Sequence, residues 1–372
     1  MIYLDNGATS FPKPASVARA TSRAMQCCAN PGRGGYEAAM RAAKVVYRCR
    51  ERAASLFGCQ PEQVVFTPNC TYGLNAAIRT LVAPGDKVAI SGFEHNAVTR
   101  PLHALKADIQ VCGRRLFDWE DILKDLRKAL QKGAKTAVFT HVSNVFGYIL
   151  PMEEIAEVCK EYGARLIIDA AQSAGMLALD MQALGADFIA MPGHKGLLGP
   201  QGTGLLLCAK VPEPLIMGGT GSESQMQDMP SFLPDRMEAG TLNVPGIAGL
   251  DAGLEVVTKR GTGEIFRRER KLARLCADAL HQMGFQVFSG EHQGGTVSFR
   301  PGWDCEELAQ ALSGMGIAVR AGLHCAPLAH ESALTLDTGT VRVSFGYGNH
   351  YHDLSGFLTA MERISAGKAR RS

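Results

Sequence analysis

The chain has 372 residues, of which 46% are hydrophobic and 20% carry a charge. This is the composition of an ordinary globular protein, and the length exceeds the size at which one hydrophobic core usually stops growing, so we expect two domains. The 39 basic and 36 acidic residues leave a net charge of +3. That charge is too small to indicate a nucleic-acid or anionic-membrane partner.

The first residues, Met1–Asn6, show no basic segment followed by an apolar one, so no signal peptide is evident. No stretch of 18 uncharged apolar residues occurs, so we expect no membrane span and a cytoplasmic protein. The 11 cysteines are scattered and include no C-x-x-C pair. We therefore expect reduced thiols, most of them small core residues, rather than disulfides or a zinc site.

The chain from about residue 60 to 210 alternates short apolar runs with helical patterns. Several of these runs are apolar at every position, as expected for strands covered on both faces. The segment 151–162 is the clearest helix, with proline in its first turn and glycine just past its end. The expected strands are Val64–Thr67, Lys87–Ser91, Ala137–Thr140, Leu166–Asp169, Phe188–Met191 and Gly204–Leu207. This alternation predicts an α/β fold with a mainly parallel sheet.

After about residue 245 the pattern becomes that of an α+β domain. A long charged helix over Thr262–Met283 is followed by short strands at Gln286–Ser289 and Gly295–Arg300. Further expected elements are a helix at Cys305–Met315, a strand ending near Arg320, a strand at Val341–Phe345 and a helix at Asp353–Ile364. We therefore expect a large domain at 16–245 and a small domain at 246–372, with residues 1–15 as an arm that joins the small domain.

Two charged residues stand at the carboxyl ends of neighbouring expected strands, where α/β sheets bind ligands. Asp169 ends a buried strand, and a charge there is costly unless it is paired, for instance with the pyridinium nitrogen of pyridoxal 5′-phosphate (PLP). Lys195 follows the next strand in the segment Gly193–Gly196, where its amine can reach an aldehyde in the same cleft. A helix cap or an ion pair for Asp169 and a surface position for Lys195 are the alternatives.

Other polar residues follow strands on the same side of the expected sheet. The segment Thr67–Thr71 leads into an expected helix over Tyr72–Leu81, and free N–H groups at a helix start suit a phosphate. His95 can stack on an aromatic ring or move a proton, Asn144 is placed to bind a ring substituent, and Gln172 lies nearby. The alternatives are plain helix capping and ordinary loop polar groups.

The segment Arg320–Pro327 contains glycine and proline, which mark a loop, so Cys325 is not expected in the core. His324 beside it can favour the thiolate. Metal binding by His324, Cys325 and His330 is an alternative, with a weak ligand spacing. Arg342 lies on an expected strand, and its guanidinium suits a carboxylate, the alternative being a surface ion pair.

Several segments, in this order, are similar to the class-V aminotransferase family of PLP enzymes, and within it to the cysteine desulfurase and selenocysteine lyase group. The resemblance runs through nearly the whole chain, from Tyr3–Thr9 to Arg342–Ser344. The matching segments between these ends are Asn30–Gly35, Ile168–Gln172, Gly193–Lys195, Glu238–Thr241 and Arg320–Cys325. The resemblance implies a type I PLP fold with a mainly parallel seven-stranded sheet and a smaller C-terminal domain.

The resemblance also implies a role for each candidate residue. Lys195 would hold the cofactor as a Schiff base, Asp169 would pair with its pyridinium nitrogen, and His95 would stack on its ring. The other implied cofactor contacts are Gln172 at the ring hydroxyl and Cys70, Thr71, His194 and, from a second subunit, Thr241 around the phosphate. The implied substrate contacts are Asn144, Arg342, Asn6 and Ala8. Cys325, on a short ordered loop, would receive the sulfur.

The implied function is removal of sulfur from L-cysteine, which gives L-alanine and a persulfide on Cys325 for transfer to an acceptor protein. Lys195, His95 and Cys325 would carry the catalysis. The contact from Thr241 implies a homodimer, because both chains then complete each cofactor site. The alternatives are a selenocysteine lyase acting on L-selenocysteine, another class-V PLP aminotransferase or lyase, and a non-catalytic PLP-binding protein.

The chain departs from the family pattern at three places. A histidine is often found where this chain has Tyr36, and a histidine pair where it has Glu94–Asn96. The region Gly218–Gly221 also differs. These departures bear on the choice of substrate and sulfur acceptor more than on the chemistry.

Overall fold

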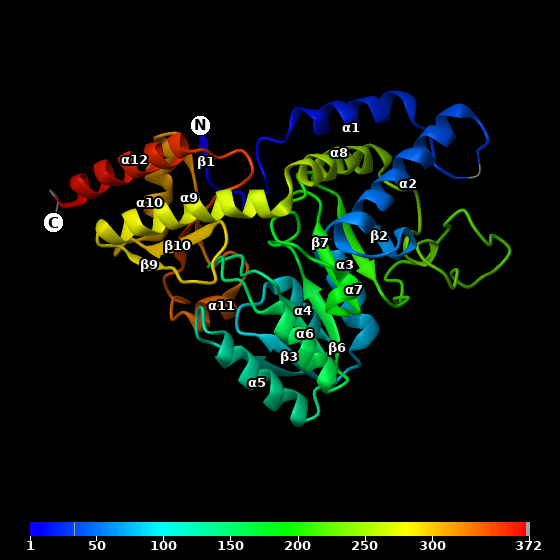
Figure 1. The fold of residues 1–372 in the computed structure, drawn as a ribbon, viewed down its shortest axis with the longest axis horizontal. Helices are drawn as coiled ribbons and strands as arrows, with labels where there is room; N and C mark the ends of the chain where they lie inside the picture. The colour runs from blue at the N-terminus through cyan, green and yellow to red at the C-terminus, as the bar shows by residue number, and fades with distance from the viewer. Residues whose placement is uncertain (33, 370–372) are drawn as a thin grey trace.

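The structure is a computed structural model that describes residues 1–32 and 34–369, so Arg33 of the Asn30–Gly35 segment lies outside the described residues. Its larger part is built on a seven-stranded sheet with the strand order β2-β8-β7-β6-β5-β3-β4 (Figure 1). The strands are β2 (Val64–Thr67), β3 (Lys87–Ser91), β4 (Asp108–Cys112), β5 (Thr136–Thr140), β6 (Arg165–Asp169), β7 (Phe188–Pro192) and β8 (Gly204–Cys208). Only β8 runs antiparallel to its neighbours. The expected mainly parallel sheet is thus confirmed.

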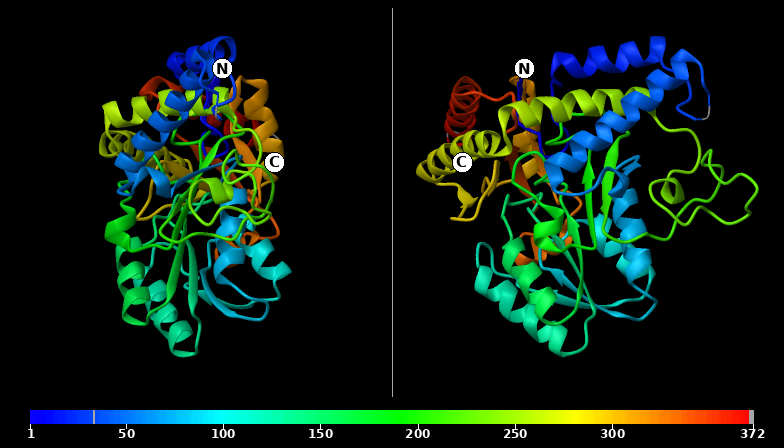
Figure 2. Two further views of the ribbon diagram at one scale, coloured as in Figure 1. Left: turned by 90° about the vertical axis from the view of Figure 1, so that its right-hand side faces the viewer. Right: turned by 45° about the vertical axis from the view of Figure 1, so that its right-hand side comes forward.

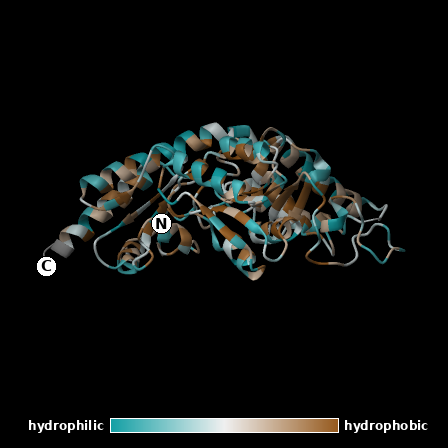
Figure 3. Cartoon of the chain, turned by 90° about the horizontal axis from the view of Figure 1, so that it is seen from below, coloured by the Kyte–Doolittle hydropathy of each residue, from teal (hydrophilic) through white to brown (hydrophobic). Residues whose placement is uncertain are grey.

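Helices cover both faces of this sheet. Because alternate residues of a strand point to opposite faces, each strand contributes side chains to both cores. Val138, Ile167 and Ala190 pack into a core with α3 and α4 on one face. Phe139 and Ile168 pack into the core with α2, α5, α6 and α8 on the other. The bounds are α2 (Glu37–Phe57), α3 (Cys70–Leu81), α4 (Asn96–Ala104), α5 (Trp119–Gln131), α6 (Met152–Glu161), α7 (Met181–Leu184) and α8 (Val244–Arg260). Figure 3 shows the same layering as hydrophobic strands under helices with hydrophilic outer faces.

One strand of the sheet, β4, was missed in the sequence. It is an edge strand whose residues are mostly exposed or half-buried, and Asp108 and Gln110 interrupt its apolar run. Edge strands need only one apolar face, so the run of consecutive apolar residues that marks the central strands does not occur here.

The smaller part contains a four-stranded antiparallel sheet of order β12-β13-β10-β9 and a separate pair, β1 with β11. The strands are β1 (Ile2–Tyr3), β9 (Gln286–Phe288), β10 (Thr296–Arg300), β11 (Ile317–Ala318), β12 (Arg320–Gly322) and β13 (Thr340–Ser344). The helices are α9 (Thr262–Gln282), α10 (Cys305–Gly314), α11 (Pro327–Ser332) and α12 (Tyr351–Ala369). Leu4 joins this second core, and β1 runs parallel to β11. These contacts support the expected N-terminal arm on the small domain.

The helix α8 determines where the two parts divide. Ile247, Leu250 and Leu254 of α8 belong to the core of the large part, and α8 lies alongside α1 (Ala15–Cys27) and α2 in Figure 1. A division at residue 245 would separate α8 from the core in which it is buried. We therefore propose that the domains divide near Gly261, the residue between α8 and α9.

An irregular segment between β8 and α8 projects from the large part and is seen from two further sides in Figure 2. Gly218–Gly221, one of the departures from the family pattern, lies in this segment. Within the part of the chain that the structure describes, no helix combines the length and the apolarity needed to cross a membrane.

Candidate active site

Eight of the candidate residues meet in one cavity at the carboxyl ends of the central strands. The cavity has about 510 Å³ of empty space, part of it open to solvent. The candidate residues that line it are Cys70, Thr71, His95, Asn144, Asp169, Gln172, His194 and Lys195. They come from the ends of five strands, β2, β3, β5, β6 and β7, and the segments that follow them, and the parallel strand order places those segments at a single edge.

Lys195 follows β7 in a turn where Gly193 and Gly196 have no room for a side chain. The N–H of Gly193 donates to the carbonyl of Thr203 at 2.8 Å, and a Cβ on Gly193 would lie 2.1 Å from Thr203 Oγ1. A Cβ on Gly196 would come within 2.3 Å of a backbone oxygen. Burial and, less strongly, the charge of Arg342 lower the pKa of the Lys195 amine. The neutral, nucleophilic form of the amine is thereby favoured.

Asp169 ends β6 and is buried beside Lys195. Its Oδ1 accepts hydrogen bonds from the N–H of Ala171 at 2.9 Å and from Cys70 Sγ at 3.4 Å. Both of these bonds use Oδ1, which leaves Oδ2 for a ligand. Burial and the Asp169 carboxylate raise the pKa of Cys70, so this thiol stays neutral and acts as a donor. The alternative of a helix cap for Asp169 is not what the structure shows.

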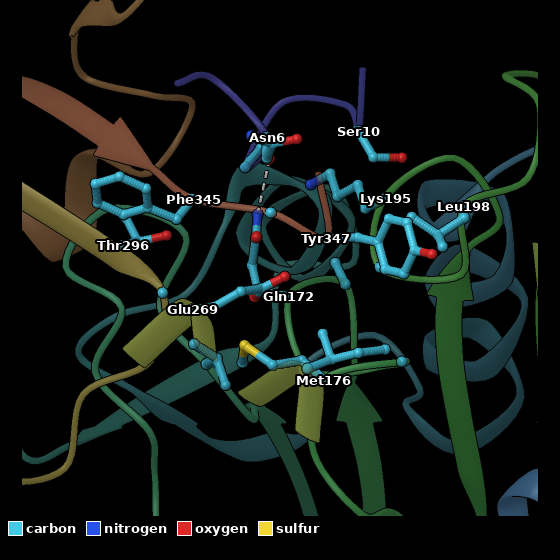
Figure 4. Close-up of a pocket in the computed structure, with 18 residues that line it drawn as sticks. Asn6, Ser10, Gln172, Met176, Lys195, Leu198, Glu269, Thr296, Phe345 and Tyr347 are labelled. Atoms are coloured by element: carbon cyan, nitrogen blue, oxygen red, sulfur yellow. Dashed lines mark hydrogen bonds between the residues drawn. The ribbon is translucent and has the colours of Figure 1, made fainter. Parts of the chain in front are cut away.

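The side chains of His95, Gln172 and Asn144 are each fixed by one backbone hydrogen bond. His95 Nδ1 accepts from the N–H of Ala97 at 3.0 Å, so a neutral His95 carries its proton on Nε2. Burial is the main cause that lowers the pKa of His95. Gln172 Nε2 donates to the carbonyl of Gly7 at 2.9 Å, the dashed line in Figure 4.

The start of α3 forms the polar end of the cavity. Asn69 caps the helix by accepting from the N–H of Tyr72 at 2.9 Å. This cap does not use the side chain of Thr71, which stays exposed and lines the cavity. His194 Nδ1 contacts Thr9 Oγ1 at 3.0 Å, and burial lowers the pKa of His194 to about 4. His194 is therefore neutral and can donate or accept only one hydrogen bond through its remaining nitrogen.

Arg342 lies on β13, and its guanidinium is held in place from two sides. Nη1 donates to the carbonyl of Asn144 at 2.9 Å, and Nη2 donates to Asp5 Oδ1 at 2.7 Å. Arg342 is 2% exposed, so the alternative of a surface ion pair is wrong. Its Nε is buried and has no partner among the described residues. Sequence reasoning missed Asp5, although it stands in the Tyr3–Thr9 segment that carries the resemblance.

Cys325 lies between β12 and α11 in a backbone conformation that residues other than glycine rarely adopt. The φ angles of His324 and Cys325 are 51° and 57°, two consecutive left-handed residues. Asn144 Nδ2 donates to the carbonyl of His324 at 2.8 Å, and the N–H of Asn96 donates to the carbonyl of Cys325 at 2.8 Å. Of the 11 cysteines, all of them described, Cys325 alone is exposed. The loop thus docks on the wall of the cavity and leaves its thiol accessible.

The expectation that His324 favours the Cys325 thiolate is wrong. His324 is buried, and burial, followed by the charge of Arg342, lowers its pKa to about 2. A neutral imidazole offers no positive charge to stabilise a thiolate. The metal alternative is also without support, because no group of three metal-ligating side chains occurs among the described residues.

The family model of class-V aminotransferases matches residues 2–357. The chain belongs to the class-V aminotransferase family. A protein named "Probable cysteine desulfurase" from Methanothermobacter thermautotrophicus is 32% identical over 98% of this chain and 94% of the relative. A protein of the same name from Pyrococcus abyssi is 33% identical over the same shares.

Solved structures in this family have the same fold. A cysteine desulfurase from Thermococcus onnurineus matches with a TM-score of 0.91 and 33% identity, over 98% of this chain and 95% of the other. The cysteine desulfurase CsdA from Escherichia coli matches with a TM-score of 0.87 and 27% identity, over 97% and 94% of the two chains. The type I fold expected from the resemblance is confirmed.

Five of the family-implied residues do not line the Lys195 cavity. Two of them are Arg342 and Cys325, described above, and the others are Asn6, Ala8 and Thr241. Asn6 lines a neighbouring cavity that shares Lys195 and Gln172 with the first (Figure 4). Ala8 is in the turn that follows Asp5 and lines neither cavity. Thr241 is exposed in a third cavity. Its contact with the cofactor within one chain is therefore not seen, and the expected contact with a second subunit stays a prediction.

Among the departures from the family pattern, Tyr36, Glu94 and Asn96 do not line the Lys195 cavity. Tyr36 precedes α2 and is exposed. Glu94 is buried and accepts from the N–H of Thr140 at 2.8 Å, which joins the ends of β3 and β5. Asn96 holds the Cys325 loop through its backbone, so a different side chain at this position keeps that contact.

Proposed function

We propose that this chain is a PLP-dependent cysteine desulfurase in which Cys325 receives the sulfur. One observation supports this most directly. An amine with a lowered pKa, Lys195, shares a cavity with the buried carboxylate of Asp169, and the exposed thiol of Cys325 sits on a loop bonded to the wall of that cavity. Related chains named cysteine desulfurase cover nearly the whole sequence.

The cavity fits PLP in its donor and acceptor groups. Lys195 Nζ would hold the aldehyde carbon, and Asp169 Oδ2 would accept from the pyridinium N–H. His95 would face the ring, with its proton on Nε2. Thr71 and the N–H groups at the start of α3 would hold the phosphate, since a helix N-terminus favours an anion. The neutral His194 adds a hydrogen bond there.

The substrate carboxylate would meet Arg342, whose buried Nε has no partner among the described residues. A buried donor without a partner is costly, and a carboxylate oxygen supplies a charged acceptor. Asn144 lies beside it, because Arg342 Nη1 donates to the backbone carbonyl of Asn144. We propose that these two residues orient L-cysteine with its sulfur toward Cys325.

PLP, when bound, supplies an electron sink for the electrons released at the substrate α carbon. Lys195 Nζ, whose neutral form is favoured by burial, accepts the α proton and later returns a proton to the product. Cys325 Sγ, as the thiolate, attacks the substrate sulfur and keeps it as a persulfide. The Cβ–S bond of the substrate breaks with its electron pair going to carbon, and a proton replaces the sulfur there to give alanine. An acceptor protein then takes that sulfur. A cytoplasmic location stays a prediction.

The decisive test is conversion of L-cysteine in the presence of dithiothreitol, with alanine and sulfide measured together. We expect equal amounts of both from the wild type and neither from Cys325→Ser. Cys27→Ser, a partly exposed cysteine on α1, is the matched control and should retain full activity. Alanine formation by Cys325→Ser at the wild-type rate would refute the role of Cys325. Turnover of L-selenocysteine alone would make the chain a selenocysteine lyase.

We further propose a homodimer in which Thr241 completes the partner's cofactor site. The test is complementation between two inactive variants, Lys195→Ala and Thr241→Ala. A dimer with one chain of each kind contains one site with both residues intact, so mixing should restore part of the activity. No recovery on mixing, with mixed dimers demonstrated, would show that Thr241 acts within its own chain or not at all.

A further inference from the structure

Two buried imidazoles belong to the Cys325 loop and to the helix α11 that follows it. His324 Nε2 contacts Thr340 Oγ1 at 3.3 Å, and His330 Nδ1 contacts Thr335 Oγ1 at 2.7 Å. The centroids of the two rings are 5.8 Å apart. The other nitrogen of each ring, His324 Nδ1 and His330 Nε2, is buried and has no partner among the described residues. Each ring therefore has one nitrogen bound to a threonine and one nitrogen unsatisfied.

Unsatisfied buried nitrogens are rare in folded proteins, and a buried water commonly satisfies them. Burial lowers the pKa of His324 to about 2 and that of His330 to about 4, so both rings are neutral. A neutral imidazole has one donor and one acceptor nitrogen. The ring centroids are 5.8 Å apart, a separation that one water bonded to both unsatisfied nitrogens can span.

The loop above these rings needs such an anchor. His324 and Cys325 have consecutive positive φ angles of 51° and 57°, and residues in this region keep that conformation only when their surroundings enforce it. The two carbonyl bonds to Asn144 and Asn96 hold one side of the loop. The ring of His324 lies 5.8 Å, centroid to centroid, from the ring of His330 on α11.

We propose that His330 is a positioning residue for Cys325, which it influences through one water shared with the imidazole of His324. This rests on the proposed function, in which Cys325 receives the sulfur. Loss of the shared water releases the His324 ring, and the backbone at residues 324 and 325 relaxes. The thiol then leaves its line of approach to the substrate sulfur, while the groups that bind substrate stay in place.

Two substitutions at one position separate this role from a structural one. His330→Gln places an amide near the position of Nε2 and keeps the contact toward His324. His330→Asn places an amide near Nδ1 and keeps only the contact to Thr335. We expect the kcat for alanine formation to fall about 10- to 100-fold in His330→Asn, with the KM for cysteine within about twofold, and His330→Gln to recover most of the activity. The reverse order would overturn the proposal, because it would assign the role to the bond with Thr335.

A second measurement does not depend on turnover. Hydrogen exchange of the Asn96 amide, which donates to the carbonyl of Cys325, reports whether the loop is docked. In the PLP-loaded protein we expect faster exchange in His330→Asn than in the wild type and His330→Gln. Equal exchange in all three would refute the positioning role even if the enzyme is a desulfurase. A wild type that makes no alanine while the exchange differs as expected would refute the proposed function alone.

Discussion

The ion pair between Asp5 and Arg342 links the N-terminal arm to the residue that we propose to bind the substrate carboxylate. Asp5 Oδ1 lies 2.7 Å from Arg342 Nη2, and the side chains are 12% and 2% exposed. The second carboxylate oxygen of Asp5 lies 3.0 Å from Arg320, whose side chain is 50% exposed. Asp5→Asn removes the charge with almost no change in shape, so it tests the electrostatic contribution of this pair.

The expected loss of stability follows from the burial of Arg342. Two unit charges 2.7 Å apart attract with about 6 kcal/mol at an effective dielectric constant of about 20. Part of this attraction is offset by the desolvation of both groups, and removing one partner of a buried pair costs about 3 to 5 kcal/mol. The exposed pair with Arg320 contributes about 0 to 1 kcal/mol. We therefore expect Asp5→Asn to lower the free energy of unfolding by about 3 to 5 kcal/mol.

Urea unfolding of the PLP-loaded protein measures this difference, and Arg320→Ala is the matched control because it removes only the exposed partner. We expect Arg320→Ala to change stability by less than about 1 kcal/mol. The KM for cysteine should rise in Asp5→Asn, because Arg342 loses the contact that orients it. A loss below about 1 kcal/mol in Asp5→Asn, equal to that of the control, would show that the pair does not stabilise the domain as argued.

Two further predictions concern burial and backbone packing. Burial raises the pKa of Glu269 to about 8 from its ordinary value of 4.5, so the folded state binds this proton more tightly than the unfolded state. The contribution of Glu269 to the free energy of unfolding is thus fully present below about pH 4.5 and is lost as the pH rises toward 8. Glu269→Gln should show a weaker decline of the thermal midpoint between pH 6 and 8, and an identical decline would contradict the assignment. Gly193→Ala puts a Cβ 2.1 Å from Thr203 Oγ1, so we expect a loss of about 1 to 3 kcal/mol and of PLP absorbance. Gly219→Ala, with open space around the added atom, should leave both unchanged.

The sequence was sufficient to predict those strands and helices whose own residues form a recognisable pattern. The six predicted central strands were found within one residue at each end, because apolar runs between turn residues reflect burial on both faces. The helix α3 begins two residues earlier than predicted, at Cys70, because the side chain of Asn69 caps it. The edge strand β4 gave no such run and was missed. Local signals thus identified the buried strands, including the edge strand β2, and missed only the partly exposed edge strand β4 of this sheet.

The candidate site was likewise predicted only in part from the sequence. Lys195, Asp169 and Cys325 were identified from strand ends, a glycine-flanked turn and a loop with glycine and proline. Asp5 was missed, and Glu269 was not singled out. Both are acidic residues whose importance comes from partners or burial supplied by distant segments.

By itself, the sequence determined the α/β fold, the family and the identity of the three residues proposed for the chemistry. Periodicity, turn residues and short motifs are local, so each can be read without knowing what lies opposite. Only the tertiary structure decided that Arg342 is buried against Asp5, that His324 is neutral, and that α8 packs with the large part. Charge state and burial depend on which segments meet in space. His324 shows this most clearly, because its pKa depends on burial beside His330 and Arg342 and not on its neighbour Cys325.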